Sequence, residues 1–231
     1  MLGSERGVTI SISGRCNQTG QLGIAIASSS MSVAARCAYA RAGTGVCATQ
    51  NITDPRLGPR ALALMELGLD AHTTLAGIRA NTEDIEFRQL GVLDHSGRTA
   101  CYSGLHSLGI FASAHGQNVI ALGNLLANAE VPKRMMSAFN ENADAELGDR
   151  LIAAMQAGLA AGGEAGPMLS AGMIIVDRVP WPIADIRVDL QDEPIKRLSE
   201  LWKAWRPQMD DYVTRALKPS AAPKFGVPGD L

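Results

Sequence analysis

Long apolar runs are missing from this chain of 231 residues, and aromatic side chains make up only 4% of it. A helix that crosses a membrane needs about 20 consecutive apolar residues, and no such run is present. Residues 1–7 carry charges and no apolar stretch follows them, which does not fit a secretory signal. The sequence therefore predicts a cytoplasmic protein with no membrane partner.

Patterned cysteines and histidines are also missing. The four cysteines stand alone, without the CxxC spacing of a zinc or redox site, and the four histidines show no metal-ligand spacing. Gly43, Thr44 and Gly45 lack the third glycine and the helix start that a nucleotide-binding loop requires. We therefore predict reduced thiols in the core, no metal and no cofactor.

An excess of one charge is absent as well, since 21 basic and 23 acidic residues give a net charge of −2. Nucleic-acid-binding proteins usually carry a basic surface, so we expect no nucleic acid as a partner. Hydrophobic residues make up 46% of the chain, which is enough for one sizeable core. With so few aromatics, we expect this core to consist of small and aliphatic side chains in closely packed layers.

What the sequence does contain is a strong strand pattern in its first fifty residues. Between residues 8 and 13, Val and Ile alternate with Thr and Ser, which predicts a strand with one apolar face. A polar turn and a second alternating segment at 22–27 complete a predicted hairpin. Ser28 follows this hairpin, and a later segment ends at Thr49 and Gln50, so hydroxyl and amide groups gather near strand ends.

The rest of the chain shows blocks of helical spacing and blocks of alternation. Helices are predicted at 59–67, 70–80, 131–140, 145–161 and 194–205, and strands at 89–93, 98–103, near 110–111, 118–122, 169–176 and 186–189. This order is typical of an α+β domain in which helices cover stacked antiparallel sheets. We assign residues 1–206 to this single domain and residues 207–231, rich in Pro, Lys and Ala, to an extended tail or arm.

Several short motifs occur in an order and spacing that one known family shares. They lie at residues 9–12, 19–23, 41–43, 48–50, 58–60, 88–92, 123–124, 161–163 and 185–189. With them the chain resembles the bacterial and archaeal domain-of-unknown-function family 1028 from residue 9 to about residue 201. The resemblance implies a four-layer αββα sandwich similar to that of the N-terminal-nucleophile hydrolases.

In that class of enzymes the first residue of the mature chain attacks an amide carbonyl, and its own α-amine is the base. The residue that matches the family's leading threonine is Thr9. Eight residues precede Thr9 here, so its nitrogen is an amide, and processing between Val8 and Thr9 is needed to free an amine. The alternative interpretation is a strand hydroxyl that faces a neighbouring sheet.

Arg187 and Asp189 lie two positions apart in a predicted strand, so they face the same side. Such a pair can position a substrate carboxylate or polarise Thr9, and the alternative is a structural ion pair at a sheet edge. In members of the family, an acidic residue and a histidine commonly follow this Asp. In this chain, Leu190 and Gln191 follow it.

Neutral polar residues at strand ends complete the predicted site. Ser28, Thr49, Gln50 and Asn124 carry donors and acceptors of the kind that an oxyanion or amide-binding site uses. Turn capping is the alternative role for such residues.

Together these residues predict an N-terminal-nucleophile-type amidohydrolase that acts on a small amide or peptide-like molecule. The alternatives are a non-catalytic protein that binds a small metabolite on the same scaffold, and hydrolysis by an activated water in the same pocket. We also expect a homodimer, with Trp202 and Trp205 of the last predicted helix at the interface. Otherwise these two side chains cover the core of their own domain.

Overall fold

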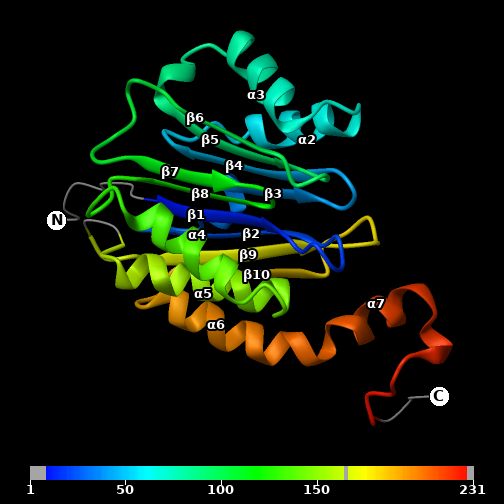
Figure 1. Ribbon diagram of the computed structural model, residues 1–231. Coiled ribbons are helices and arrows are strands. Elements are labelled where there is room, and N and C mark those ends of the chain that lie inside the picture. Colours follow the sequence, from blue (N-terminus) through cyan, green and yellow to red (C-terminus); the bar gives the residue numbers. More distant parts are fainter. Residues whose placement is uncertain (1–8, 164–165, 228–231) are drawn as a thin grey trace.

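The computed structural model describes residues 9–163 and 166–227, and two stacked antiparallel sheets form its centre (Figure 1). The larger sheet has six strands in the order β10 (Ala184–Val188), β9 (Ser170–Val176), β2 (Leu22–Ser28), β1 (Thr9–Arg15), β8 (Val119–Asn124) and β7 (Ala112–Gly116). The smaller sheet has four strands in the order β3 (Ala38–Arg41), β4 (Gly45–Asn51), β5 (Arg88–Asp94) and β6 (Thr99–Ser103). The prediction of stacked antiparallel sheets in a mixed fold is confirmed.

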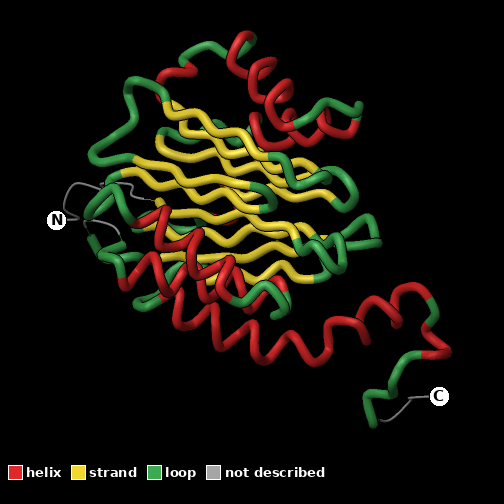
Figure 2. The backbone as a smooth tube through the Cα atoms, in the orientation of Figure 1, coloured by secondary structure: helices red, strands yellow, loops and turns green. Residues whose placement is uncertain are grey.

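Helices lie on both outer sides of the two sheets, as Figure 2 shows. The smaller sheet is covered by α2 (Leu57–Glu66) and α3 (Ala71–Ala80), and the larger sheet by α4 (Val131–Glu141), α5 (Leu147–Ala160) and α6 (Pro194–Trp205). Further helices are α1 (Ala34–Cys37) and α7 (Met209–Leu217) and the short 3-10 helices η1 (Ile85–Phe87), η2 (Arg206–Gln208) and η3 (Pro219–Ala221). The layers therefore follow the order helices, sheet, sheet, helices.

The alternation in β1 explains how this strand sits between two layers. Ile10 and Ile12 are fully buried in the cluster that joins the larger sheet to its helices. Thr9, Ser11 and Ser13 point the other way, toward the smaller sheet, because successive strand residues face opposite sides. Burial of one Ile contributes about 1.5–3 kcal/mol, and a shift by one residue would reverse both faces, so these two residues fix the register.

The space between the sheets is filled mostly by aliphatic side chains. Ile26 of the larger sheet packs there with Val46 and Leu93 of the smaller sheet. Gly91 of β5 allows a close approach, because a Cβ atom at this position would lie 2.5 Å from Leu122 Cδ1 of β8. The composition predicts small residues where layers touch, and Gly91 is such a residue at the contact between the two sheets.

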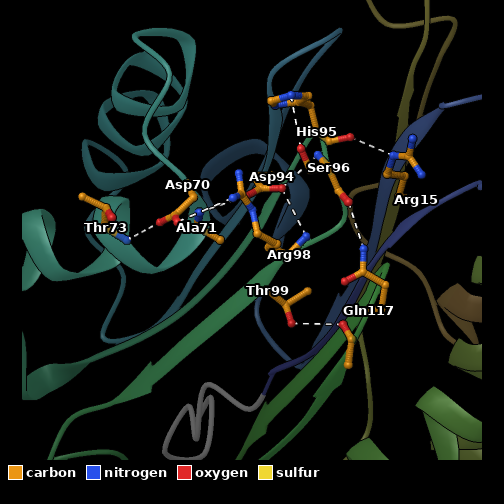
Figure 3. Close-up of polar contacts among 11 residues, drawn as sticks. Arg15, Asp70, Ala71, Thr73, Asp94, His95, Ser96, Arg98, Thr99 and Gln117 are labelled. Carbon is orange, nitrogen blue, oxygen red and sulfur yellow. Dashed lines mark hydrogen bonds and ion pairs between the residues drawn. The ribbon is translucent and has the colours of Figure 1, made fainter.

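A buried carboxylate anchors the hairpin between β5 and β6 to α3 (Figure 3). Asp94 is 1% exposed, and its Oδ2 accepts from the Ala71 main-chain N–H at 3.1 Å and from Arg98 Nε at 2.8 Å. Asp70 caps α3 by accepting from the Thr73 N–H at 2.7 Å, which is the cap that the sequence predicts. This polar cluster lies at the opposite end of β1 from Thr9, and it stabilises the fold.

Three local predictions differ from the structure. The short strand expected near Ile110 and Phe111 is β7, which begins at Ala112, and both of those apolar side chains are exposed. Helix α1 and strand β3 are not among the predicted elements. The chain after residue 207 is not simply extended, because Met209–Leu217 form helix α7.

Helix α7 belongs partly to the main body. Val213 is buried in the core cluster, and Met209 packs against it. From there the chain extends away from the helical layer (Figure 1). Among residues 9–163 and 166–227, none of the helices has the length and apolar character needed to cross a bilayer.

Candidate functional site

A row of four polar residues crosses the larger sheet at the end where β1 begins. The strand register places Asn124, Thr9, Ser28 and Ser170 side by side on β8, β1, β2 and β9. Thr9 is 5% exposed and the other three are fully buried. All four point into the space between the sheets, where an aliphatic cluster lies beside them. The structure thus brings together Thr9, Ser28 and Asn124 of the predicted site.

A chain of hydrogen bonds leads from Thr9 to a guanidinium group. Thr9 Oγ1 lies 3.2 Å from Ser28 Oγ, which lies 2.9 Å from Ser30 Oγ. Arg36 Nη2 donates to Ser30 Oγ at 2.7 Å. Within the described residues Arg36 makes no ion pair, and its other hydrogen bonds go to main-chain oxygens. A positive charge that has no carboxylate partner among the described residues therefore lies at the far end of this chain of hydroxyls.

Ser170 fixes the loop that carries these groups. Its hydroxyl donates to the Ser30 main-chain oxygen at 2.6 Å and accepts from the Val33 N–H at 3.1 Å. The main-chain oxygen of Asp189 accepts from the Ser32 N–H at 2.9 Å. These contacts hold Ser30 in place beside Ser28.

Side-chain amides form a second network on the other side of Thr9. Ser11 Oγ donates to Gln50 Oε1 at 2.7 Å, and Gln50 Nε2 donates to Gln89 Oε1 at 2.8 Å. Asn124 Nδ2 donates to the same Gln89 oxygen at 3.1 Å, while Gln89 Nε2 donates to the main-chain oxygen of Gly123 at 3.0 Å. All three amide side chains are fully buried. Hydrogen bonds in such an interior are electrostatically stronger than in water and strengthen one another.

Gln89 and Ser11 are site residues that are not among those predicted from the sequence. Gln89 lies near the start of β5, and its neighbour Gln50 lies near the end of β4. Each of these two glutamines therefore occupies a buried strand position where an apolar residue is expected. A polar side chain on the buried face of two neighbouring strands is the signal that points to them.

Thr49 is not part of this arrangement. Its neighbour Gln50 faces the larger sheet, so Thr49 faces the helices, and its hydroxyl donates to the main-chain oxygen of Asp54 at 3.2 Å. The structure therefore does not bring Thr49 to Thr9, and it gives Thr49 a contact that holds the loop before α2.

Arg187 and Asp189 lie at the edge of the larger sheet. Strands β9 and β2 lie between β10 and β1. The distance between β10 and β1 is therefore three strand spacings of about 4.8 Å, or about 14 Å. The guanidinium of Arg187 binds the carboxylate of Asp185 on its own strand, at 2.8 and 3.0 Å. The structure thus does not bring Arg187 within hydrogen-bonding reach of Thr9, and its role in orienting a substrate stays a prediction.

Two cavities open elsewhere on the body. One, of about 440 Å³, lies at the far end of the β1–β2 hairpin and includes Cys16 and Trp202 in its lining. Burial raises the pKa of the Cys16 thiol, but hydrogen bonds from Thr19 and Gln18 outweigh this, so the pKa lies below its usual value. The other, of about 350 Å³, lies between the end of α5 and the start of α6. Neither is lined by Thr9, Ser28 or Asn124.

The networks around Thr9 hold hydroxyls, neutral amides and one guanidinium. In these networks, as far as the structure describes them, there is no carboxylate, imidazole, thiol or amine side chain. A proton acceptor for the Thr9 hydroxyl would therefore have to come from its own nitrogen or from a ligand. Among residues 9–163 and 166–227, no three His, Cys, Asp or Glu side chains are grouped so that they could hold a metal ion.

Comparison with known proteins agrees with the resemblance seen in the sequence. A solved structure of protein SPO2555 from Silicibacter pomeroyi, of the DUF1028 family, superposes with a TM-score of 0.79 at 27% identity, over 85% of this chain and 88% of that one. Anbu (ancestral beta-subunit) from Yersinia bercovieri gives a TM-score of 0.37 at 10% identity, over 94% of this chain and all of that one, which is too low to support an argument. No protein with a curated description matches the chain.

A family model described as "Family of unknown function (DUF1028)" matches residues 9–198, so its match begins at Thr9. This match covers most of the chain, and it agrees with the extent of the motifs noted in the sequence. The protein therefore belongs to the DUF1028 family.

Proposed function

We propose that this DUF1028 protein is an amidohydrolase of N-terminal-nucleophile type, in which Thr9, freed by cleavage after Val8, attacks a small amide or peptide-like substrate. The observation that carries the proposal is the place of Thr9. It is the first residue of an inner strand, its hydroxyl faces the space between the two sheets, and it is flanked by Ser28 and Asn124. A likeness of the fold to N-terminal-nucleophile hydrolases is part of the same proposal.

The chemistry would use groups that already lie around Thr9. The hydroxyl of Ser28 lies within hydrogen-bonding distance of Thr9 Oγ1 and would hold this atom toward the substrate carbonyl. The α-amine released by cleavage would accept the Oγ1 proton, because the described side chains of the surrounding networks include no carboxylate or imidazole that could do so. Arg36, which has no carboxylate partner among the described residues, would attract the negatively charged end of a substrate.

The first test is the intact mass and the N-terminal sequence of freshly purified and of aged protein. We expect loss of the eight residues before Thr9. A chain that keeps those residues after ageing, while it is active on an amide, would contradict a terminal nucleophile. It would favour the activated-water alternative, in which turnover survives loss of the Thr9 hydroxyl.

The second test is turnover in a screen of small amides and dipeptides, read as release of free amine. Thr9→Ala should lose turnover by at least about 1,000-fold, as other nucleophile deletions do. Thr214→Ala, at a half-buried position of α7 where the hydroxyl donates to the Asp210 main-chain oxygen, is the matched control and should keep full turnover. Unchanged turnover in Thr9→Ala would rule out the nucleophile.

One observation favours the alternative of a non-catalytic protein that binds a small metabolite. Thr9 is only 5% exposed in the chain as described, so its hydroxyl is covered. A binding protein would change the melting temperature with a metabolite and consume none of it, and this behaviour would not depend on cleavage. The predicted homodimer and the cytoplasmic location remain predictions beside either function.

A further inference from the structure

The side-chain oxygen of Asn124 is a fully buried acceptor that receives no hydrogen bond from the described residues. It belongs to the residue directly opposite Thr9 on β8. We propose, on the basis of the function proposed above, that this Oδ1 atom is the acceptor that holds the free α-amine of Thr9. Asn124 is then a positioning residue for the base, and not the oxyanion donor that its residue type suggests.

The orientation of the Asn124 amide follows from its neighbours. Gln89 Nε2 donates to the main-chain oxygen of Gly123, which can only accept, so Gln89 Oε1 has to point away from that oxygen. Asn124 Nδ2 donates to Gln89 Oε1 at 3.1 Å. A flipped Asn124 would set two oxygens against each other. Nδ2 is therefore engaged, and Oδ1 is the atom that needs a donor.

The nitrogen of Thr9 points at the same strand. In an antiparallel pair of strands, hydrogen-bonded and non-hydrogen-bonded residue pairs alternate. The Arg15 N–H donates to the main-chain oxygen of Asn118 at 2.9 Å. In the same register, the pair of Thr9 and Asn124 lies an even number of residues from the pair of Arg15 and Asn118. Thr9 and Asn124 therefore also form a hydrogen-bonded pair. The Thr9 nitrogen therefore faces β8, while its hydroxyl lies beside Ser28.

This arrangement leaves one electron pair free for catalysis. The two hydrogens of a neutral Thr9 amine would be accepted by the main-chain oxygen and by Oδ1 of Asn124, so the lone pair is available to the hydroxyl. In the attack, the proton leaves Oγ1 for this nitrogen, Oγ1 bonds to the substrate carbonyl carbon, and the carbonyl π electrons move to oxygen. The proton then passes to the leaving nitrogen as the C–N bond breaks.

Charged groups are few around this amine. In the hydrogen-bonded networks that contain Thr9 and Asn124, the described charged side chain is Arg36, which is reached through Ser28 and Ser30. The other members are hydroxyls and neutral amides. A new charge at position 124 should therefore have a clear effect on the amine.

The test uses the full chain with a protease recognition sequence placed immediately before Thr9. Cleavage of the folded protein then leaves Thr9 first, whether or not the chain processes itself. The pKa of the new α-amine is measured from its acetylation by acetic anhydride between about pH 5 and pH 10, with the N-terminal peptide read by mass spectrometry. We expect Asn124→Asp to raise this pKa by about one unit, a tenfold change in the ratio of ammonium to amine, because a carboxylate favours the ammonium.

Asn124→Ala should lower the same pKa, because the ammonium loses an acceptor. Asn140→Asp, the same change at an exposed position near the end of α4, is the matched control and should leave the pKa unchanged. An amine pKa that is equal in the parent, Asn124→Asp and Asn124→Ala would overturn the assignment. If Asn124→Asp does not fold, the alanine variant decides.

This outcome is separate from that of the proposed function. The proposed function fails when Thr9→Ala keeps its turnover or when an active native chain never frees Thr9. The role of Asn124 fails when the amine made by the added protease does not respond to the substitutions.

Discussion

At the scale of single residues, Gln89 is the centre of the polar network beside Thr9. It accepts from the amides of Gln50 and Asn124 and donates to the main-chain oxygen of Gly123, and it is fully buried. Because water does not reach these groups in the described chain, each loses its partner when Gln89 is removed. The fold and the candidate site therefore depend on the same side chain.

We predict that Gln89→Leu lowers the free energy of unfolding by about 2–5 kcal/mol, because it leaves two buried amides without their acceptor. The measurement is urea unfolding followed by circular dichroism. Gln208→Leu, at an exposed position where Nε2 donates only to the Ala204 main-chain oxygen, is the control and should change the free energy of unfolding by less than about 0.5 kcal/mol. Equal effects of the two variants would mean that the network does not stabilise the fold.

A second residue-scale prediction concerns pH and Asp54. Hydrogen bonds and charge from Arg56 lower the pKa of this carboxyl, although burial opposes them. A carboxyl whose pKa falls on folding stabilises the native state above its unfolded pKa, and this contribution disappears as the pH falls through the folded pKa. Between about pH 6 and pH 3 the parent should lose more free energy of unfolding than Asp54→Asn.

The comparison is made by urea titrations at both pH values. Asp192→Asn, at an exposed position before α6, is the control, and its loss between the two pH values should match that of the parent. A loss in Asp54→Asn as large as in the parent would show that this carboxyl does not link stability to pH.

At the scale of elements, the distance between the two sheets depends on small residues. A Cβ atom at Gly91 would lie 2.5 Å from Leu122 Cδ1, a side chain that is itself packed between the sheets. We predict that Gly91→Ala lowers the free energy of unfolding by about 1–3 kcal/mol through overpacking. Gly116→Ala is the matched control in β7, because a Cβ atom added there would meet nothing within 4 Å.

The measurement is thermal unfolding of both variants beside the parent. A melting temperature of Gly91→Ala that equals that of Gly116→Ala would show that the sheets can separate to admit a methyl group at little cost.

Much of the element order could be predicted because local signals agree with burial. The alternation around Ile10 and Ile12 gave β1, and the cap of Asp70 gave the start of α3. β3 is only four residues long and follows α1 without a break, so no period could reveal it. The resemblance to the family predicted Thr9 as the central residue of the site. The side-chain pairings did not, because the contact of Gln89 with Asn124 depends on strand register and on how the two sheets stack.

At the scale of the whole molecule, the last helix connects the core to a surface that extends away from it. Val213 is buried against the core, and the Trp205 and Tyr212 rings lie 5.0 Å apart, which joins α7 to the end of α6. Trp202 is 2% exposed, so this side chain covers the core of its own domain. Leu217 and Phe225 remain largely exposed, at 62% and 60%. Exposed apolar side chains are therefore present on the segment after α6.

We predict that the full chain is a homodimer and that the segment 209–227 provides its contact. A chain that stops after Gln208 should be monomeric by light scattering, because it lacks the exposed apolar groups of α7 and of the segment after it. The same truncation should lower the free energy of unfolding by at least about 2 kcal/mol, because it removes buried Val213. A chain that stops after Leu217 is the control, since it keeps α7 and its core contacts but lacks Phe225. If that chain stays dimeric, α7 itself makes the contact, and if the full chain is monomeric, the predicted arm is wrong.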